Sequence, residues 1–168
     1  MEGRAFFIAM ILGFTCYISC KRDSTSAPEE VIITEETHSP SISELREKLS
    51  EEGYQTFDYV DEKSGDTVLM QQYFIAFLKS GPSRSQSKEE ADSLQVLHLA
   101  HLARMYEEGY ADISGPFGDD GEIRGITIYN TPTLEMADSL ANLDPMVKAG
   151  RLVIELHPWW AGKGFPLR

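Results

Sequence analysis

Two histidines, His98 and His101, have the residue type and the spacing that acid–base or metal chemistry could use. They lie in Leu94–Phe117, a stretch that predicts one helix ending at a glycine, then a strand and a Gly-Pro corner. On a helical wheel of about 100° per residue, His98 falls at the centre of the apolar face and His101 at its margin. An imidazole buried there needs a hydrogen-bond partner, because leaving it unpaired costs on the order of 1–3 kcal/mol.

Three interpretations of these histidines are open. His98 could move a proton to or from a ligand, or it could be a core histidine whose hydrogen bonds are simply satisfied. Both histidines could also point at one metal ion from the same helix face. No clear third ligand accompanies them, so we predict no metal site and no cofactor. A Ser-His-Asp hydrolase is rejected, because the sequence has no nucleophile-elbow motif.

The segments around this helix predict an α+β domain over residues 68–168. Their order is β-α-β-β-α-β, a ferredoxin-like arrangement with the helices on one face of the sheet. The other face also needs a cover, and a second copy is the simplest one, so we expect a homodimer. The predicted segments are strand Thr67–Leu78, a helix from the Ser87 cap to Gly109, strands Tyr110–Gly115 and Ile123–Tyr129, a helix capped by Thr131 and begun by Pro132, a turn begun by Asp144-Pro145, and strand Arg151–Leu156.

Residues 41–67 form an extension before this unit. Ser41 and Glu44 have the spacing of a capping box, and Gly53 ends the short helix that they open. A strand at Tyr54–Val60 follows. The extension therefore predicts a helix and a strand that precede the first strand of the ferredoxin-like unit.

The N-terminus has the pattern of a bacterial lipoprotein signal. The apolar run Ala5–Ile18 is too short to span a bilayer, and residues 17–20 (YISC) resemble a lipobox with a tyrosine where leucine is usual. We predict a signal peptide over residues 1–19 and an acylated Cys20, which begins a flexible tether over residues 20–40. The protein is then expected at the cell envelope, on the outer rather than the inner membrane. The alternative is an ordinary cleaved signal peptide and a free periplasmic protein.

The charge and the cysteines limit the possible partners further. A net charge of −12 over 168 residues repels nucleic-acid phosphates and anionic lipids. We therefore expect no nucleic-acid partner, and membrane contact through the acyl anchor alone. Once Cys20 is acylated and Cys16 is removed with the signal peptide, no thiol remains, which excludes cysteine nucleophiles and cysteine zinc sites.

A series of short motifs occurs in a fixed order between Met70 and Gly162. The motifs are Tyr73–Leu78, His98-Leu99, Gly109, Gly115-Pro116-Phe117, Asp119–Gly121, Asp144-Pro145, Gly150 and Pro158-Trp159-Trp160. This order resembles the YCII-related (YciI-like) family, and more narrowly its secreted lipoprotein branch. The resemblance implies a ferredoxin-like subunit that pairs into a dimeric α+β barrel.

The resemblance also implies a site made of a histidine and an aspartate. The family's histidine lies eleven residues before the helix-ending glycine, which selects His98, and its Asp-Pro aspartate corresponds to Asp144. Gly115 and Pro116 are expected to line the ligand pocket with their backbone, because glycine lets a ligand approach closely. His101 is expected to line it as well. Asp144 before a proline also looks like a helix N-cap, so capping alone is the alternative role.

The expected function is His/Asp proton transfer on a small organic molecule, by an envelope-anchored protein that acts as a lyase, an isomerase or a hydrolase. The alternative is a module without catalysis that binds a small ligand or an envelope protein in the same cleft. The inward-pointing His98 favours chemistry, whereas the lack of a second acid or a nucleophile favours binding.

Overall fold

A computed structural model describes residues 40–167 of the chain. The predicted signal peptide over residues 1–19, the acylated Cys20 and nearly all of the tether lie outside the described residues. Within residues 40–167, none of the helices has the length and apolar character that crossing a membrane requires.

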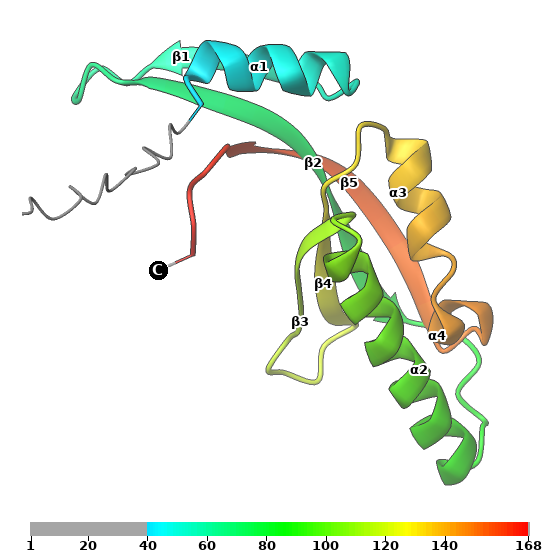
Figure 1. Ribbon diagram of the computed structural model, residues 1–168. Coiled ribbons are helices and arrows are strands. Elements are labelled where there is room, and N and C mark those ends of the chain that lie inside the picture. Colours follow the sequence, from blue (N-terminus) through cyan, green and yellow to red (C-terminus); the bar gives the residue numbers. More distant parts are fainter. Residues whose placement is uncertain (1–39, 168) are drawn as a thin grey trace, which may run out of the picture. The chain divides into compact units, whose positions relative to one another are not determined.

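The elements follow the order α1-β1-β2-α2-β3-β4-α3-α4-β5 (Figure 1). The helices are α1 (Ile42–Glu51), α2 (Lys88–Glu107), α3 (Leu134–Ala141) and α4 (Pro145–Lys148). The strands are β1 (Thr56–Val60), β2 (Thr67–Ser80), β3 (Ala111–Pro116), β4 (Ile123–Tyr129) and β5 (Leu152–Gly162).

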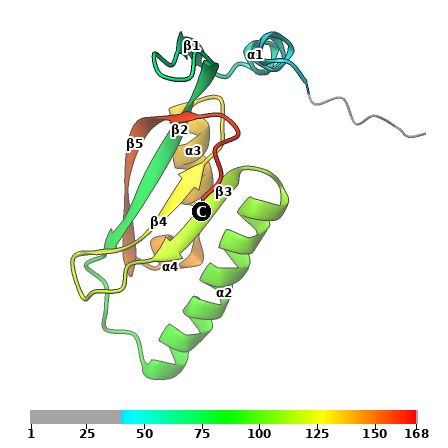
Figure 2. The same ribbon diagram turned by 90° about the vertical axis from the view of Figure 1, so that its left-hand side faces the viewer.

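The strands form one antiparallel sheet centred on β2. β5 pairs along one edge of β2, while β1 and β4 pair with successive parts of the other edge, and β3 pairs with β4. The resulting order β5-β2-β4-β3 is visible in Figure 2, and α2, α3 and α4 all lie on one side of this sheet in Figure 1. This confirms the predicted ferredoxin-like β-α-β-β-α-β unit.

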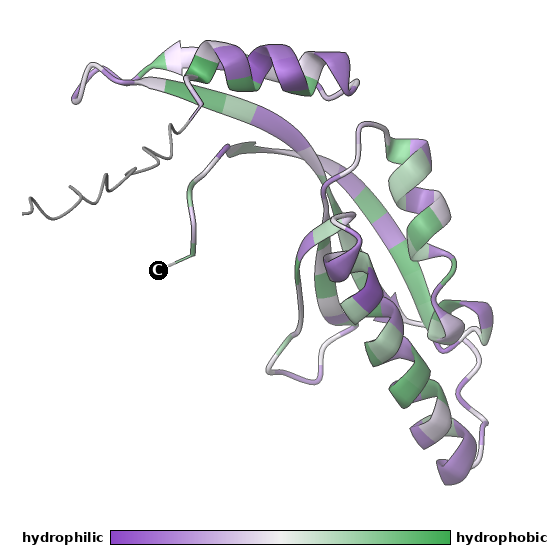
Figure 3. Ribbon diagram, viewed as in Figure 1, coloured by the Kyte–Doolittle hydropathy of each residue, from purple (hydrophilic) through white to green (hydrophobic). Residues whose placement is uncertain are grey.

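The core lies between the sheet and the helices α2, α3 and α4. Successive side chains of a strand point to opposite faces, so alternate residues of β2 reach this core. Figure 3 shows apolar residues along the strands behind these helices, whereas α1 is mostly hydrophilic. The buried core consists of Phe74, Ala76, Leu78, Met105, Ala111, Tyr129, Ala137, Ala141, Met146 and Leu152.

Capping boxes begin α1 and α2 as predicted. The Ser41 and Ser87 hydroxyls each accept a hydrogen bond from the backbone N–H three residues later, and the glutamate at that position binds back to the serine N–H. Gly53 and Gly109 follow the two helices with φ angles of 86° and 76°. Glycine suits this left-handed backbone region, because it has no Cβ to clash.

The predicted start of α3 is wrong. Thr133, rather than Thr131, is the N-cap, and the helix begins at Leu134 instead of Pro132. Thr131 is buried, and its hydroxyl donates a hydrogen bond to the Thr133 carbonyl oxygen. Both threonines are suitable caps by residue type, so the burial of the first one decided between them.

The predicted end of the last strand is also wrong, because β5 continues beyond Leu156 to Gly162. β2 is 14 residues long and offers pairing partners as far as Met70, opposite Gly162. Pro158 does not interrupt the strand. β5 is an edge strand, so the missing N–H can fall on its unpaired side.

Candidate active site

His98 lies where two different sides of α2 meet. On one side the helix is packed into the core through Met105 and His101, both buried. On the other side, at about 40–100° around the helix from His98, α2 lines a cavity. That cavity side consists of Gln95, Leu99 and Leu102. Because His98 is on the border, its ring is nearly buried at 8% exposure and still contributes to the cavity wall.

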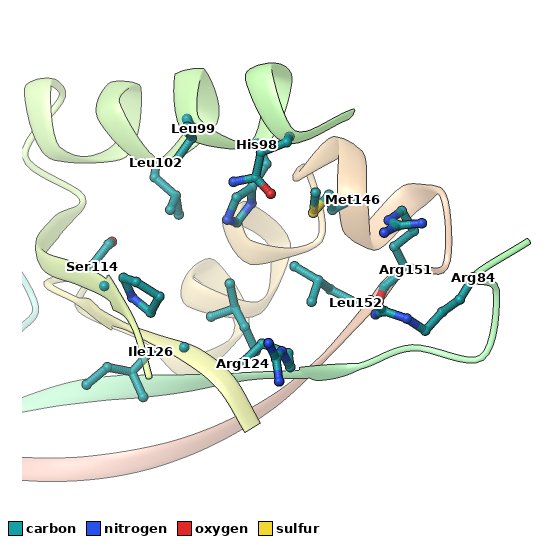
Figure 4. Close-up of a pocket in the computed structure, with 15 residues that line it drawn as sticks. Arg84, His98, Leu99, Leu102, Ser114, Arg124, Ile126, Met146, Arg151 and Leu152 are labelled. Carbon is teal, nitrogen blue, oxygen red and sulfur yellow. The ribbon is translucent and has the colours of Figure 1, made fainter. Parts of the chain in front are cut away.

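His98 and Asp144 form a hydrogen bond. His98 Nδ1 lies 2.5 Å from Asp144 Oδ2, and both side chains are buried. A carboxylate only accepts hydrogen bonds, so Nδ1 carries the hydrogen and donates it. In the neutral ring, Nε2 then keeps its lone pair. Figure 4 shows the ring extending from α2 into the cavity, which gives Nε2 access to a ligand.

Asp144 uses its two oxygens for two tasks. Oδ2 binds His98, and Oδ1 accepts the backbone N–H of Met146 at 2.8 Å, which makes Asp144 the N-cap of α4. Capping and histidine pairing, which the sequence left as alternatives, are therefore combined. Since both oxygens are engaged, the carboxylate has a fixed orientation towards the imidazole.

The structure does not place His101 in the cavity wall. Its Nδ1 lies 3.2 Å from Arg104 Nη2, and its buried Nε2 has no hydrogen-bond partner among residues 40–167. Burial is the main cause that lowers the pKa of His101, and the nearby Asp144 charge partly opposes it. The described part of the chain also contains no cluster of three His, Cys, Asp or Glu side chains suited to a metal ion.

The cavity has a volume of about 370 Å³, within the range of small-molecule sites. It lies between α2 and the strands below it in Figure 4. Gly115 and Pro116, at the end of β3, line it. The apolar part of its wall also includes Leu78, Leu99, Leu102, Ile126, Met146 and Leu152.

Sequence reasoning missed the polar part of the wall. Arg84, Arg124 and Arg151 line the cavity from three separate segments, together with Ser114. The Ser114 hydroxyl lies 3.0 Å from that of Thr127. No spacing in the sequence connects the three arginines, because only the folding of the chain brings their segments to one cavity.

No protein-family model matches this chain, and no curated protein matches it significantly. Among solved structures, it resembles 5-chloro-2-hydroxyhydroquinone dehydrochlorinase of Burkholderia phenoliruptrix, in a complex with 2,5-dihydroxybenzoquinone. The sequence identity is 20% and the TM-score is 0.41, over 52% of this chain and 92% of that chain. At this similarity we draw no functional conclusion from that enzyme.

Proposed function

We propose that this domain transfers protons to and from a small organic molecule in the cavity, with His98 as the base and acid and Asp144 as its partner. The observation that carries this proposal is the 2.5 Å contact between His98 Nδ1 and Asp144, beside a cavity that the same ring lines. Proton transfer of this kind serves a lyase, an isomerase or a hydrolase. The matching residues of the YciI-like family, which the motif order resembles, support it, and we propose that the chain is a member.

In this proposal each group has a separate task. Asp144 fixes the orientation and tautomer of the imidazole, and its negative charge stabilises the imidazolium that forms when Nε2 takes a proton. The cap hydrogen bond from Met146 keeps the carboxylate in place while this happens. His98 then returns the proton to the ligand at another atom, or to a leaving group.

A second candidate is a module that binds a small ligand or an envelope protein without catalysis. One observation favours it. Among the described residues that line the cavity there is one histidine, His98, and no aspartate, glutamate, cysteine, tyrosine or lysine, and the Ser114 hydroxyl is already paired with Thr127. The cavity thus offers neither a second acid nor an activated nucleophile.

Hydrogen exchange separates these two candidates. The protein is incubated in D2O with a mixture of small organic acids, ketones and lactones, and the compounds are followed by NMR. We expect a compound that gains deuterium or is converted, and a rate at least about 100-fold lower for His98→Gln. His157→Gln is the matched control, because His157 is exposed on β5 and binds Glu155 outside the cavity.

The outcomes of this experiment are distinct. If His98→Gln acts as fast as the wild type, the proposed role of His98 is wrong. If compounds bind and none exchanges or reacts, the binding module is the correct candidate.

We also propose that the domain forms a homodimer through the sheet face opposite α2, α3 and α4. The strand registers place partly exposed apolar side chains together on that face, namely Ile75, Phe77, Ile113, Ile128 and Val153. A second copy would remove this apolar surface from water. Light scattering at micromolar concentration should give a dimer that Ile128→Lys dissociates, and Leu97→Lys, on the exposed side of α2, should not. A monomeric wild type would contradict this proposal.

The envelope anchor remains a proposal that rests on the Ile18-Ser19-Cys20 motif. A diacylated or triacylated Cys20 would hold the protein stably at the membrane. Cys20→Ala should therefore move the protein from the detergent phase to the aqueous phase and abolish acyl labelling. Continued partitioning of this variant with membranes would refute the lipobox interpretation.

A further inference from the structure

We propose that the ligand of this cavity is a small organic anion, with an apolar body and a carboxylate group that Arg84, Arg124 and Arg151 bind. This inference rests on the proposed function, because it names the class of ligand that His98 would act on. It concerns how the ligand is bound, and it does not depend on which bond is broken.

The charge of the cavity is opposite to that of the protein. The chain has a net charge of −12, yet three arginines line the cavity and no carboxylate side chain of residues 40–167 does. Asp144 is bonded to the other side of the His98 ring. Guanidinium groups bind carboxylates through two parallel N–H···O hydrogen bonds. The cavity is thus selective for an anion within an acidic protein.

Arg84 and Arg151 are bonded to neutral groups. Arg84 Nη1 donates to the Arg151 carbonyl oxygen at 3.3 Å, and Arg151 Nη1 donates to Gln86 Oε1 at 2.8 Å. No carboxylate of the described residues lies within 4.0 Å of either guanidinium. A guanidinium has five N–H donors, so most of them are available to a ligand. Arg124 Nη1 donates to the Gly121 carbonyl oxygen at 3.1 Å, and Arg124 Nη2 lies 3.7 Å from the exposed Asp120, a surface pair that is weak.

A close backbone contact fixes Arg84 relative to Arg151. Gly81 N donates to the Arg151 carbonyl oxygen at 2.8 Å, and Ser83 N donates to that of Gly150 at 3.0 Å. A Cβ atom on Gly81 would lie 2.2 Å from the Gly150 oxygen, so a larger residue does not fit there. The loop after β2 is therefore held against the start of β5, and two of the arginines are positioned before a ligand binds.

A β-bulge directs Arg124 to the cavity. Leu78 of β2 pairs with Gly125, whereas the next residue, Lys79, pairs with Ile123, so Arg124 is an extra residue in β4. In a regular strand, Arg124 would point to the face opposite that of Gly125, away from α2. Bulges change the direction of a side chain in this way, and Arg124 does line the cavity.

The arginines and the apolar wall match the two parts of such a ligand. Figure 4 shows Arg84, Arg124 and Arg151 on the side of the cavity away from Ser114. His98 lies above the space between Ser114 and the arginines. A carboxylate on the arginines would leave the rest of the ligand against the apolar wall, for example Leu102 and Leu152. The body of the ligand would then lie below the His98 ring.

Benzoate and benzamide test this inference, because they have nearly the same shape and differ in charge. Binding is followed by NMR chemical-shift changes of the chain without the predicted signal peptide, residues 1–19. We expect benzoate to bind at least about tenfold more tightly than benzamide. Arg84→Gln and Arg151→Gln should each weaken benzoate binding about tenfold and leave benzamide unchanged. Arg46→Gln is the matched control, because Arg46 is on α1 and pairs with Asp58.

Each outcome has one meaning. Equal binding of the two probes, binding of neither at tens of millimolar, or an undiminished affinity in both arginine variants would overturn the anion assignment. Tighter binding of inorganic phosphate than of benzoate would overturn the proposal that the ligand is a carboxylate with an apolar body. His98→Gln should keep the preference for benzoate. If it does, and the wild type still transfers no proton, the proposed function fails while the anion site stands.

Discussion

His98 and His101 are both buried and lie one helical turn apart on α2, but their surroundings differ. The Nδ1 atom of His98 contacts the Asp144 carboxylate, and its ring lines the cavity. The Nδ1 atom of His101 contacts the Arg104 guanidinium, and its Nε2 is enclosed without a partner among the described residues. One ring thus has a carboxylate and access to a ligand, and the other has neither.

The partners also imply opposite tautomers. A carboxylate only accepts and a guanidinium only donates, so a neutral His98 carries its hydrogen on Nδ1 and a neutral His101 carries it on Nε2. Only His98 then has a lone pair directed at the cavity, as a general base needs. Burial on the apolar face of a helix is common to both residues, so the chemistry of the partner is what distinguishes the candidate base.

The largest effect is expected from Asp144→Ala. It removes the N-cap of α4, which is worth about 1 kcal/mol, and leaves buried His98 Nδ1 unpaired, which costs about 1–3 kcal/mol. The free energy of unfolding, from urea denaturation at pH 7, should fall by about 2–4 kcal/mol. Asp144→Asn is the control that still caps, and its cost should be about 1 kcal/mol. A loss below about 1 kcal/mol for the alanine variant would show that the pair contributes no stability.

Most of the fold could be predicted because its signals are local. The capping boxes at Ser41 and Ser87 and the glycine after each helix act within a few residues, and they appear in the structure as expected. The start of α3 could not be predicted in the same way. Thr131 and Thr133 are both able to cap, and the choice depended on the tertiary burial of Thr131.

The candidate site likewise has residues that local sequence signals predict and residues that depend on tertiary structure. The inward position of His98 follows from helical periodicity, and the Asp144 cap follows from its Asp-Pro dipeptide. The arginines could not be predicted. Arg124 reaches the cavity through a bulge, and Arg84 reaches it through the close contact of Gly81 with Gly150, which are far apart in the sequence. These depend on strand register and close packing, which no short motif encodes.

A smaller effect on the free energy of unfolding is expected when the pH is lowered. Burial lowers the pKa of His101 below its ordinary value of 6.5, so the unfolded chain binds this proton more readily than the folded one. The contribution of neutral His101 to the free energy of unfolding is fully present above pH 6.5. It is lost as the pH falls below 6.5 towards the lowered pKa that His101 has in the folded protein. His101→Leu should remove this part of the acid sensitivity, as measured by urea denaturation from pH 7.5 to pH 5.

The same variant also has an expected effect at neutral pH. Leucine removes a buried N–H that lacks a partner, so stability at pH 7.5 should be kept or raised by about 1 kcal/mol. A loss of several kcal/mol there, or an unchanged slope with pH, would mean that the His101 ring is paired and that the two histidines are more alike than their contacts indicate.

The smallest effect is expected from Arg104→Met, which keeps most of the apolar stem and removes the donor to His101 Nδ1. Arg104 is half-exposed, so stability should change by at most about 0.5 kcal/mol. Without the guanidinium, Nδ1 is no longer restricted to accepting, and the ring nitrogen NMR signals of His101 should move from the Nε2–H form towards a mixture. The pKa of His101 should rise, because the Arg104 charge is one of the causes that lower it.

His98 should keep the Nδ1–H form in this variant, because Asp144 determines it. A tautomer change at His98 in this variant would show that the two rings respond together, and the distinction between the candidate base and its buried neighbour would fail.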